Sequence, residues 1–110
     1  MAFVEGGNAG ALSGTTEVVA VAAPVALTRR IVRTLVVHNR DTAPVGLIVA
    51  SAKGAARRRI AAPLLKAGAT WNCTDVFVLG ATDESIVLSL AAPPATANPD
   101  FHSTYADVTP

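Results

Sequence analysis

The feature that most constrains the fold of this chain is a series of short β-type segments separated by turn clusters. Residues 29–38 form the most strand-like segment because they are rich in β-branched residues. This run ends in residues 39–44, where Asn and Asp favour hydrogen bonds between side chain and backbone in a turn. Residues 45–50 then alternate between two faces, and residues 51–54 turn the chain again. The pattern predicts successive β-strands.

Segments of the same kind recur along the chain. We predict further strands at residues 16–21, 57–62, 64–65, 75–79, 85–90 and 101–108. The strands at 75–79 and 85–90 are expected to form a hairpin with a longer loop, and the proline-rich residues 92–99 form a connection. Parallel strands would need crossovers of about a dozen or more residues, which this spacing does not leave. We therefore predict an all-β fold, an antiparallel two-sheet β-sandwich of about seven or eight strands.

The N-terminal segment differs in composition from the rest of the chain. Residues 1–15 are rich in Gly, Ala, Ser and Asn, and their sizeable apolar residues are Phe3, Val4 and Leu12. Such a segment cannot close a core alone, so we predict a flexible Gly/Ala-rich arm at 1–15 and a single β-sandwich domain at 16–110. An arm becomes ordered by joining a neighbour's sheet or by anchoring side chains in a groove. Phe3, Val4 and Leu12 are therefore candidate protein-contact residues.

The composition favours a small protein that assembles into something larger. The 110 residues suffice for one domain, of which roughly two-thirds of the unfolded surface can be buried. Hydrophobic residues make up 51% and charged residues 15%, against about 25% charged in ordinary soluble domains. The apolar stretches fall far short of the about 20 residues that a membrane helix needs. The first residues lack the basic stretch and apolar core of a signal peptide, so we expect synthesis in the cytoplasm.

Residues suited to catalysis or metal binding are sparse. Cys73 is the only cysteine, which excludes an intramolecular disulfide and a cysteine-based zinc site. The sequence has no Gly-rich phosphate loop, no Gly-x-Ser-x-Gly motif and no His-x-x-x-His pair. His38 and His102 lie far apart in the sequence, and Asp41 is better explained as closing its turn than as a calcium ligand. We predict no enzyme activity, no metal site and no cofactor.

The basic cluster Arg57, Arg58 and Arg59 is the strongest binding signal. With Lys53 and Lys66 it concentrates positive charge in a chain whose net charge is only +1. One interpretation, which we favour, is an edge strand protected by charge against unwanted pairing. A second is contact with an acidic protein surface, which makes the three arginines candidate contact residues. Nucleic-acid binding is the least favoured, because no aromatic residues are interleaved with the arginines.

Several segments resemble a recurrent pattern in small virion proteins of tailed bacteriophages. They are residues 28–45, in which a strand ends in an Asn-x-Asp turn before a second strand, and residues 64–68, 78–86 and 103–108. The resemblance implies a β-sandwich structural component, most plausibly a head decoration (cement) protein that binds the major capsid protein on the outer head surface and self-associates. It equally permits a head–tail connector or a tail component. It implies no catalytic residues.

A ligand-binding sandwich, such as a carbohydrate module, is the remaining alternative. Such modules present exposed aromatic side chains that stack on sugar rings. Trp71 and Tyr105 are the candidates for that role here. We expect both to be largely buried, which argues against this class.

Overall fold

The computed structural model of the chain describes residues 2–73 and 77–109. Within these residues it contains ten β-strands and no helix. The strands are β1 (Ala2–Ala11), β2 (Val18–Val21), β3 (Arg29–His38), β4 (Val45–Lys53), β5 (Ala56–Ala61), β6 (Leu64–Leu65), β7 (Thr70–Cys73), β8 (Phe77–Leu79), β9 (Glu84–Leu90) and β10 (Asp100–Thr109). The strands β3 and β6 have the predicted bounds, whereas β1 and β7 were not predicted as strands.

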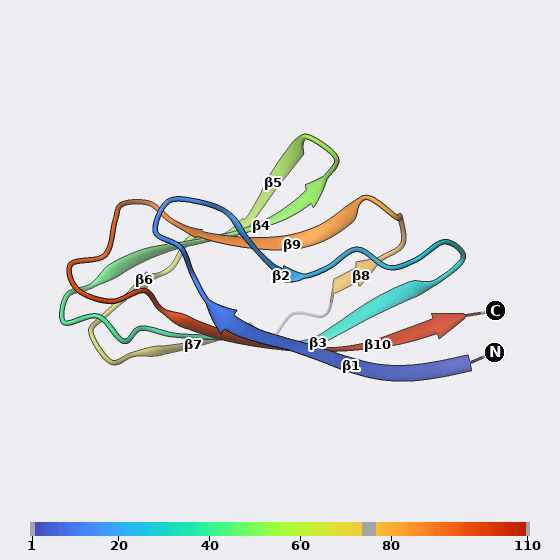
Figure 1. The fold of residues 1–110 in the computed structure, drawn as a ribbon, viewed down its shortest axis with the longest axis horizontal. Helices are drawn as coiled ribbons and strands as arrows, with labels where there is room; N and C mark the ends of the chain where they lie inside the picture. The colour runs from blue at the N-terminus through green and yellow to red at the C-terminus, as the bar shows by residue number, and fades with distance from the viewer. Residues whose placement is uncertain (1, 74–76, 110) are drawn as a thin grey trace.

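The described strands form two five-stranded sheets in which every paired neighbour is antiparallel. The first sheet has the order β1-β10-β3-β7, and β8 also pairs with β3. The second has the order β2-β9-β4-β5, and β6 also pairs with β4. Figure 1 shows the sheets as two layers, with β1 beginning and β10 ending at the same end of the molecule. The prediction of an all-β fold with two antiparallel sheets is confirmed.

The larger of two buried hydrophobic clusters among the described residues receives side chains from both sheets. Leu35 of β3, Leu47 of β4 and Leu88 of β9 are 0–1% exposed. Burying a leucine side chain contributes about 1.5–3 kcal/mol, so this core accounts for much of the stability of the fold. Leu12, which directly follows β1, is 3% exposed and belongs to the same cluster. The structure therefore places this predicted contact residue in the core.

The strand β1 occupies the segment for which we expected a flexible arm. It pairs with β10 along its whole length without a register shift. Gly6 lies opposite Tyr105 and Gly10 opposite Phe101. The two aromatic rings fill the space beside the glycines, and a Cβ added to Gly6 would lie 2.7 Å from the Tyr105 ring. An aromatic residue opposite a strand glycine compensates for the missing side chain, which is why residues 2–11 form a strand here.

The predicted hairpin between residues 75–79 and 85–90 is wrong. Residues 75 and 76 lie outside the described part of the chain, and β8 pairs with β3 in the first sheet. The strand β9 belongs to the second sheet, where β2 and β4 pair with its two edges. Its three consecutive buried residues, Ile86, Val87 and Leu88, are typical of a central strand. No edge of β9 is therefore left for β8, and the connection between them crosses from one layer to the other.

The turn that follows β3 is a buried polar junction. Asn39 is 0% exposed, donates from Nδ2 to the carbonyls of Ala43, Leu65 and Lys66, and accepts from the Asp41 N–H. Asp41 accepts hydrogen bonds from the backbone of Thr42 and from the proline-rich connection at residues 95–96. The interpretation of Asp41 as a turn-closing residue is confirmed. The Asn-x-Asp turn thus fastens three connections at one end of the two layers.

Candidate interaction surface

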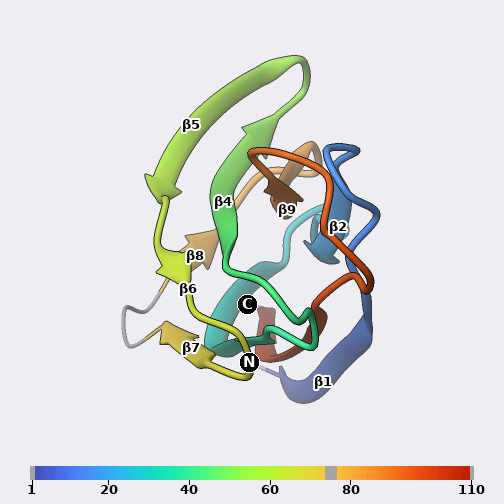
Figure 2. The ribbon, with the colours of Figure 1, turned by 90° about the vertical axis from the view of Figure 1, so that its left-hand side faces the viewer.

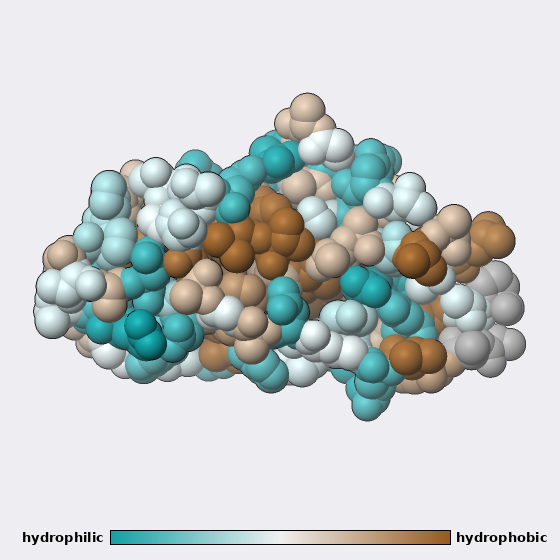
Figure 3. All heavy atoms as spheres, in the orientation of Figure 1, coloured by the Kyte–Doolittle hydropathy of each residue, from teal (hydrophilic) through white to brown (hydrophobic). Residues whose placement is uncertain are grey.

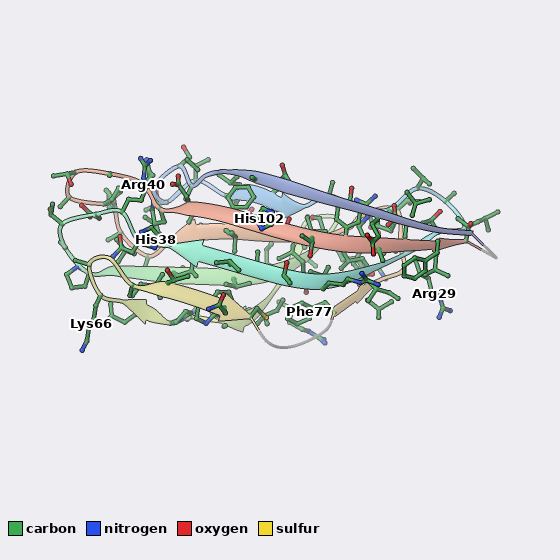
Figure 4. All side chains as sticks on the ribbon, turned by 90° about the horizontal axis from the view of Figure 1, so that it is seen from below. Arg29, His38, Arg40, Lys66, Phe77 and His102 are labelled. Carbon is green, nitrogen blue, oxygen red and sulfur yellow. The ribbon has the colours of Figure 1, made fainter. Side chains whose placement is uncertain are left out.

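The described residues contain no group of three or more His, Cys, Asp or Glu side chains that could hold a metal ion. His38 and His102 lie on adjacent strands, both exposed, and His38 Nδ1 is 2.8 Å from the hydroxyl of Thr70 (Figure 4). Cys73 is half-buried in β7. No described helix is long and apolar enough to cross a membrane. We next describe the exposed surfaces of the molecule.

The basic cluster lies on β5, an edge strand of the second sheet. Arg57 donates two hydrogen bonds from Nε and Nη2 to the carboxylate of Glu17 at 2.8–2.9 Å, which raises the pKa of the arginine and lowers that of the glutamate. Arg58 and Arg59 are exposed and form no ion pair within the described residues. The predicted charged edge strand is confirmed. Two open depressions beside β5 both include Glu84, so the lining is mixed in charge and does not select an anion.

Most of the exposed large apolar side chains lie on a different surface. Phe3 and Val4 of β1 are 54% and 61% exposed, and Val25 and Leu27 in the β2–β3 connection are 72% and 86% exposed. Figure 3 shows brown, apolar atoms at the right-hand end, where this connection and the start of β1 lie. We call these four residues the apolar end. Phe3 lies beside Arg33 of β3, with the guanidinium 5.4 Å from its ring centroid, and exposed apolar residues gathered at one end of a molecule mark interaction sites more often than scattered single ones.

The connection between β2 and β3 holds its apolar side chains outward by an unusual backbone. Pro24 and Thr28 are buried at its two ends, and the Thr28 N–H donates to the Val25 carbonyl at 3.2 Å. Between them Leu27 has φ 63°, and it is the one non-glycine residue with positive φ among the described residues. A leucine in this region is strained. Holding Leu27 exposed to solvent in this conformation therefore costs the folded state conformational free energy.

An ionic cluster behind the apolar end supports it. Arg30 of β3 donates to both carboxylate oxygens of Asp107 on β10 at 2.8 and 2.9 Å, and to the Ala22 carbonyl at 2.8 Å. Its guanidinium lies 3.9 Å from the ring centroid of Tyr105. The hydrogen bonds to Asp107 raise the pKa of Arg30. Because this side chain joins β3, β10 and the start of the β2–β3 connection, it fixes the position of the exposed loop.

The structure brings together only some of the predicted contact residues. Phe3 and Val4 lie at the apolar end, whereas Arg57–Arg59 lie on β5 in the other sheet, and Figure 2 shows β1 and β5 on opposite sides of the molecule. Sequence reasoning missed Val25 and Leu27. The sequence pattern that could have identified them is the connection at residues 24–27, which consists of apolar residues where polar turn formers are usual.

Neither a protein-family model nor a curated protein sequence matches the chain. Among solved structures, a chain of the cyanophage Pam1 capsid asymmetric unit has a similar fold, with a TM-score of 0.50 and 16% sequence identity. The similarity covers 99% of this chain and 84% of that chain, so the two chains are of similar length. At this identity the likeness shows a shared fold.

Proposed function

We propose that this chain is a non-enzymatic bacteriophage virion protein, a capsid decoration or cement protein that binds the major capsid protein on the outer head surface. The observation that carries the proposal is the apolar end, in which four large apolar side chains are more than half exposed. The fold of the chain resembles that of a chain in a phage capsid asymmetric unit. The resemblance of its sequence segments to small virion proteins of tailed bacteriophages supports the same proposal.

The apolar end is suited to attachment because its side chains gain free energy only when a partner covers them. Burying an exposed Leu or Val contributes about 1.5–3 kcal/mol. A pair of such residues gives a weak contact on its own, but a shell presents the same site many times by symmetry. Copies that also contact one another are held by several weak contacts together. We therefore propose that the chain self-associates as well as binding the capsid.

The carbohydrate-binding alternative has less support. Tyr105 lies between the Arg30 guanidinium and Gly6, so its ring face is already in use. Trp71 is half-buried in β7. Neither residue is part of an exposed aromatic platform of the kind that sugar stacking requires.

Binding to purified phage heads that lack the protein tests the proposal. We expect saturable binding, and cryo-electron microscopy of the decorated heads should show density repeated over the head lattice. The double variant Val25→Ser/Leu27→Ser should bind at least about tenfold more weakly, because each substitution removes an apolar contact. Leu64→Ser is the matched control, since Leu64 is 73% exposed but lies on β6, away from the apolar end.

Two results would overturn the proposal. Density confined to one vertex or to the tail would instead assign the chain to the head–tail connector or tail components. Equal binding by the double variant and by Leu64→Ser would remove the apolar end from the attachment surface.

A further inference from the structure

The four described sheet edges differ in how they are protected against pairing with another chain. The strand β5 carries three consecutive arginines, and β2 has four residues with a register shift. The third edge consists of β7 and β8, with four and three residues. The strand β1 has ten residues in unbroken register, contains no Pro, Lys or Arg, and carries one charge, on Glu5. Short length, bulges and charge are the usual protections of edges, and β1 has none of them beyond Glu5.

The hydrogen-bond pattern shows which groups of β1 face away from β10. The Leu12 N–H donates to the Pro99 carbonyl in line with the β10 ladder, so the even-numbered residues direct their backbone groups toward β10. The odd-numbered residues 3, 5, 7, 9 and 11 direct theirs outward. In agreement, the Ala9 N–H is taken by the Asn8 Oδ1 at 3.0 Å and not by β10. Figure 4 shows β1 along the margin of the first sheet.

We propose that the outer edge of β1 pairs with β1 of a second copy of this chain, antiparallel about a two-fold axis. The inference specifies the surface of the proposed self-association and does not depend on capsid binding. It rests on the self-complementary sequence of β1, whose first half holds the bulky Phe3, Val4 and Glu5 and whose second half holds only Gly, Asn and Ala. A two-fold antiparallel pair places the bulky half of each copy against the small half of the other.

The outward groups restrict the register of this pair. Odd residues must lie opposite odd residues, because only these direct their N–H and carbonyl groups outward, and the Ala9 N–H would exchange its bond to Asn8 Oδ1 for one to the second copy. Two such registers overlap most of the strand, and they place Glu5 opposite either Gly7 or Ala9 of the second copy. The two Glu5 carboxylates are diagonal neighbours when Glu5 lies opposite Gly7 and are well separated when it lies opposite Ala9, so like-charge repulsion favours the second register, in which the exposed Phe3 ring lies over Ala11. The pairing thus joins the two first sheets into one and covers part of the apolar end.

Substitution of Ala9 tests the proposal with matched charges at one exposed site. Ala9 of one copy lies opposite or diagonal to Glu5 of the other, so Ala9→Glu creates two symmetric like-charge contacts and Ala9→Lys creates two attractive ones. By sedimentation equilibrium we expect the wild type to have twice the 11.2 kDa chain mass. The dimer dissociation constant of Ala9→Glu should exceed that of Ala9→Lys by about tenfold at low salt. High salt should reduce this difference.

The results of these experiments test β1 pairing independently of capsid binding. Circular dichroism should show that both Ala9 variants keep the wild-type fold, since Ala9 is exposed. Ala9→Pro, which removes an outward N–H, should be monomeric. A wild type that stays monomeric up to about millimolar concentration, or equal dissociation constants for the Glu and Lys variants, overturns β1 pairing. A monomer that still decorates heads overturns only this inference, and a dimer that fails to bind heads overturns only the proposed function.

Discussion

Replacement of Leu27 by glycine should stabilise the fold, which is the opposite of what most substitutions do. Leu27 has φ 63°, a region that costs an L-residue about 1–2 kcal/mol and a glycine almost nothing. Glycine loses more chain entropy on folding, about 0.5–1 kcal/mol. The side chain is 86% exposed, so its removal gives up little burial. We therefore expect a net gain of about 0.5–1 kcal/mol, or roughly 2–6 °C in Tm for a domain of this size.

The same replacement should weaken attachment to phage heads. The methyl groups that are lost are those that a partner would bury, at about 1.5–3 kcal/mol for a leucine side chain, so affinity should fall about tenfold or more. A variant that is more stable but binds less well would separate the two effects. It would show that the strained backbone serves the contact and not the fold.

Val25→Gly provides the matched control within the same loop. Val25 is 72% exposed like Leu27, but its φ is not positive, so glycine there only adds flexibility and should cost about 0.5–1 kcal/mol. Urea unfolding of both variants, followed by circular dichroism, gives the two free energies of unfolding. The reasoning is refuted if Leu27→Gly destabilises the fold as much as Val25→Gly does.

Three further substitutions or conditions test the interior of the fold. Asn39→Ala should lower the free energy of unfolding by about 2–4 kcal/mol, because it leaves buried carbonyls and an N–H without partners, whereas the exposed Asn72→Ala should change it by less than about 0.5 kcal/mol. Burial alone would raise the pKa of Asp41, but the hydrogen bonds donated to its carboxylate lower it from 3.8 to about 2. The stability it contributes should be present above about pH 4 and be lost as the pH falls through about 2 in an acid titration, and Asp41→Asn should remove this part of the pH dependence. Gly6→Ala should loosen β1, seen as faster amide exchange there, because its Cβ would meet an aromatic ring at 2.7 Å, while Gly80→Ala meets nothing within 4 Å and should leave exchange unchanged.

The strands that could be predicted from sequence are those whose own residues determine them. The strand β3 is rich in β-branched residues and ends at an Asn-x-Asp turn, and β9 and β10 also lie close to their predicted bounds. The assignment failed where a strand depends on its partner. The hairpin between β8 and β9 was a reasonable inference from spacing, but it required knowing that β2 already pairs with one edge of β9. Such pairing between distant segments leaves no local pattern in the sequence.

The residues of the candidate surface also divide into those that the sequence could predict and those that it could not. Phe3 and Val4 could be proposed from sequence because large apolar residues stand out in a Gly-rich segment, and both are exposed in the structure. Leu12 satisfied the same criterion, yet it is buried, because the strand before it turns the chain into the core. Leu27 could not be found from its residue type. Its importance lies in a backbone angle, which depends on the buried residues on both sides of the loop.

The glycines of β1 connect the fold to its proposed assembly. Composition predicts that a segment with three glycines in ten residues is flexible, and in isolation that reasoning is sound. In the structure Gly6 and Gly10 are covered by the rings of Tyr105 and Phe101, so the strand is held from one side. Gly7 is the third, and a Cβ added to it would lie 2.8 Å from the Ser103 carbonyl oxygen of β10, so the lack of a side chain lets the backbone of β10 approach closely. All three glycines thus let β1 fit closely against β10, while the outer edge of β1 has no strand partner among the described residues. Faster amide exchange in β1 of the wild type at concentrations where it is monomeric than at those where it is dimeric would show that a second copy also contributes to the order of β1.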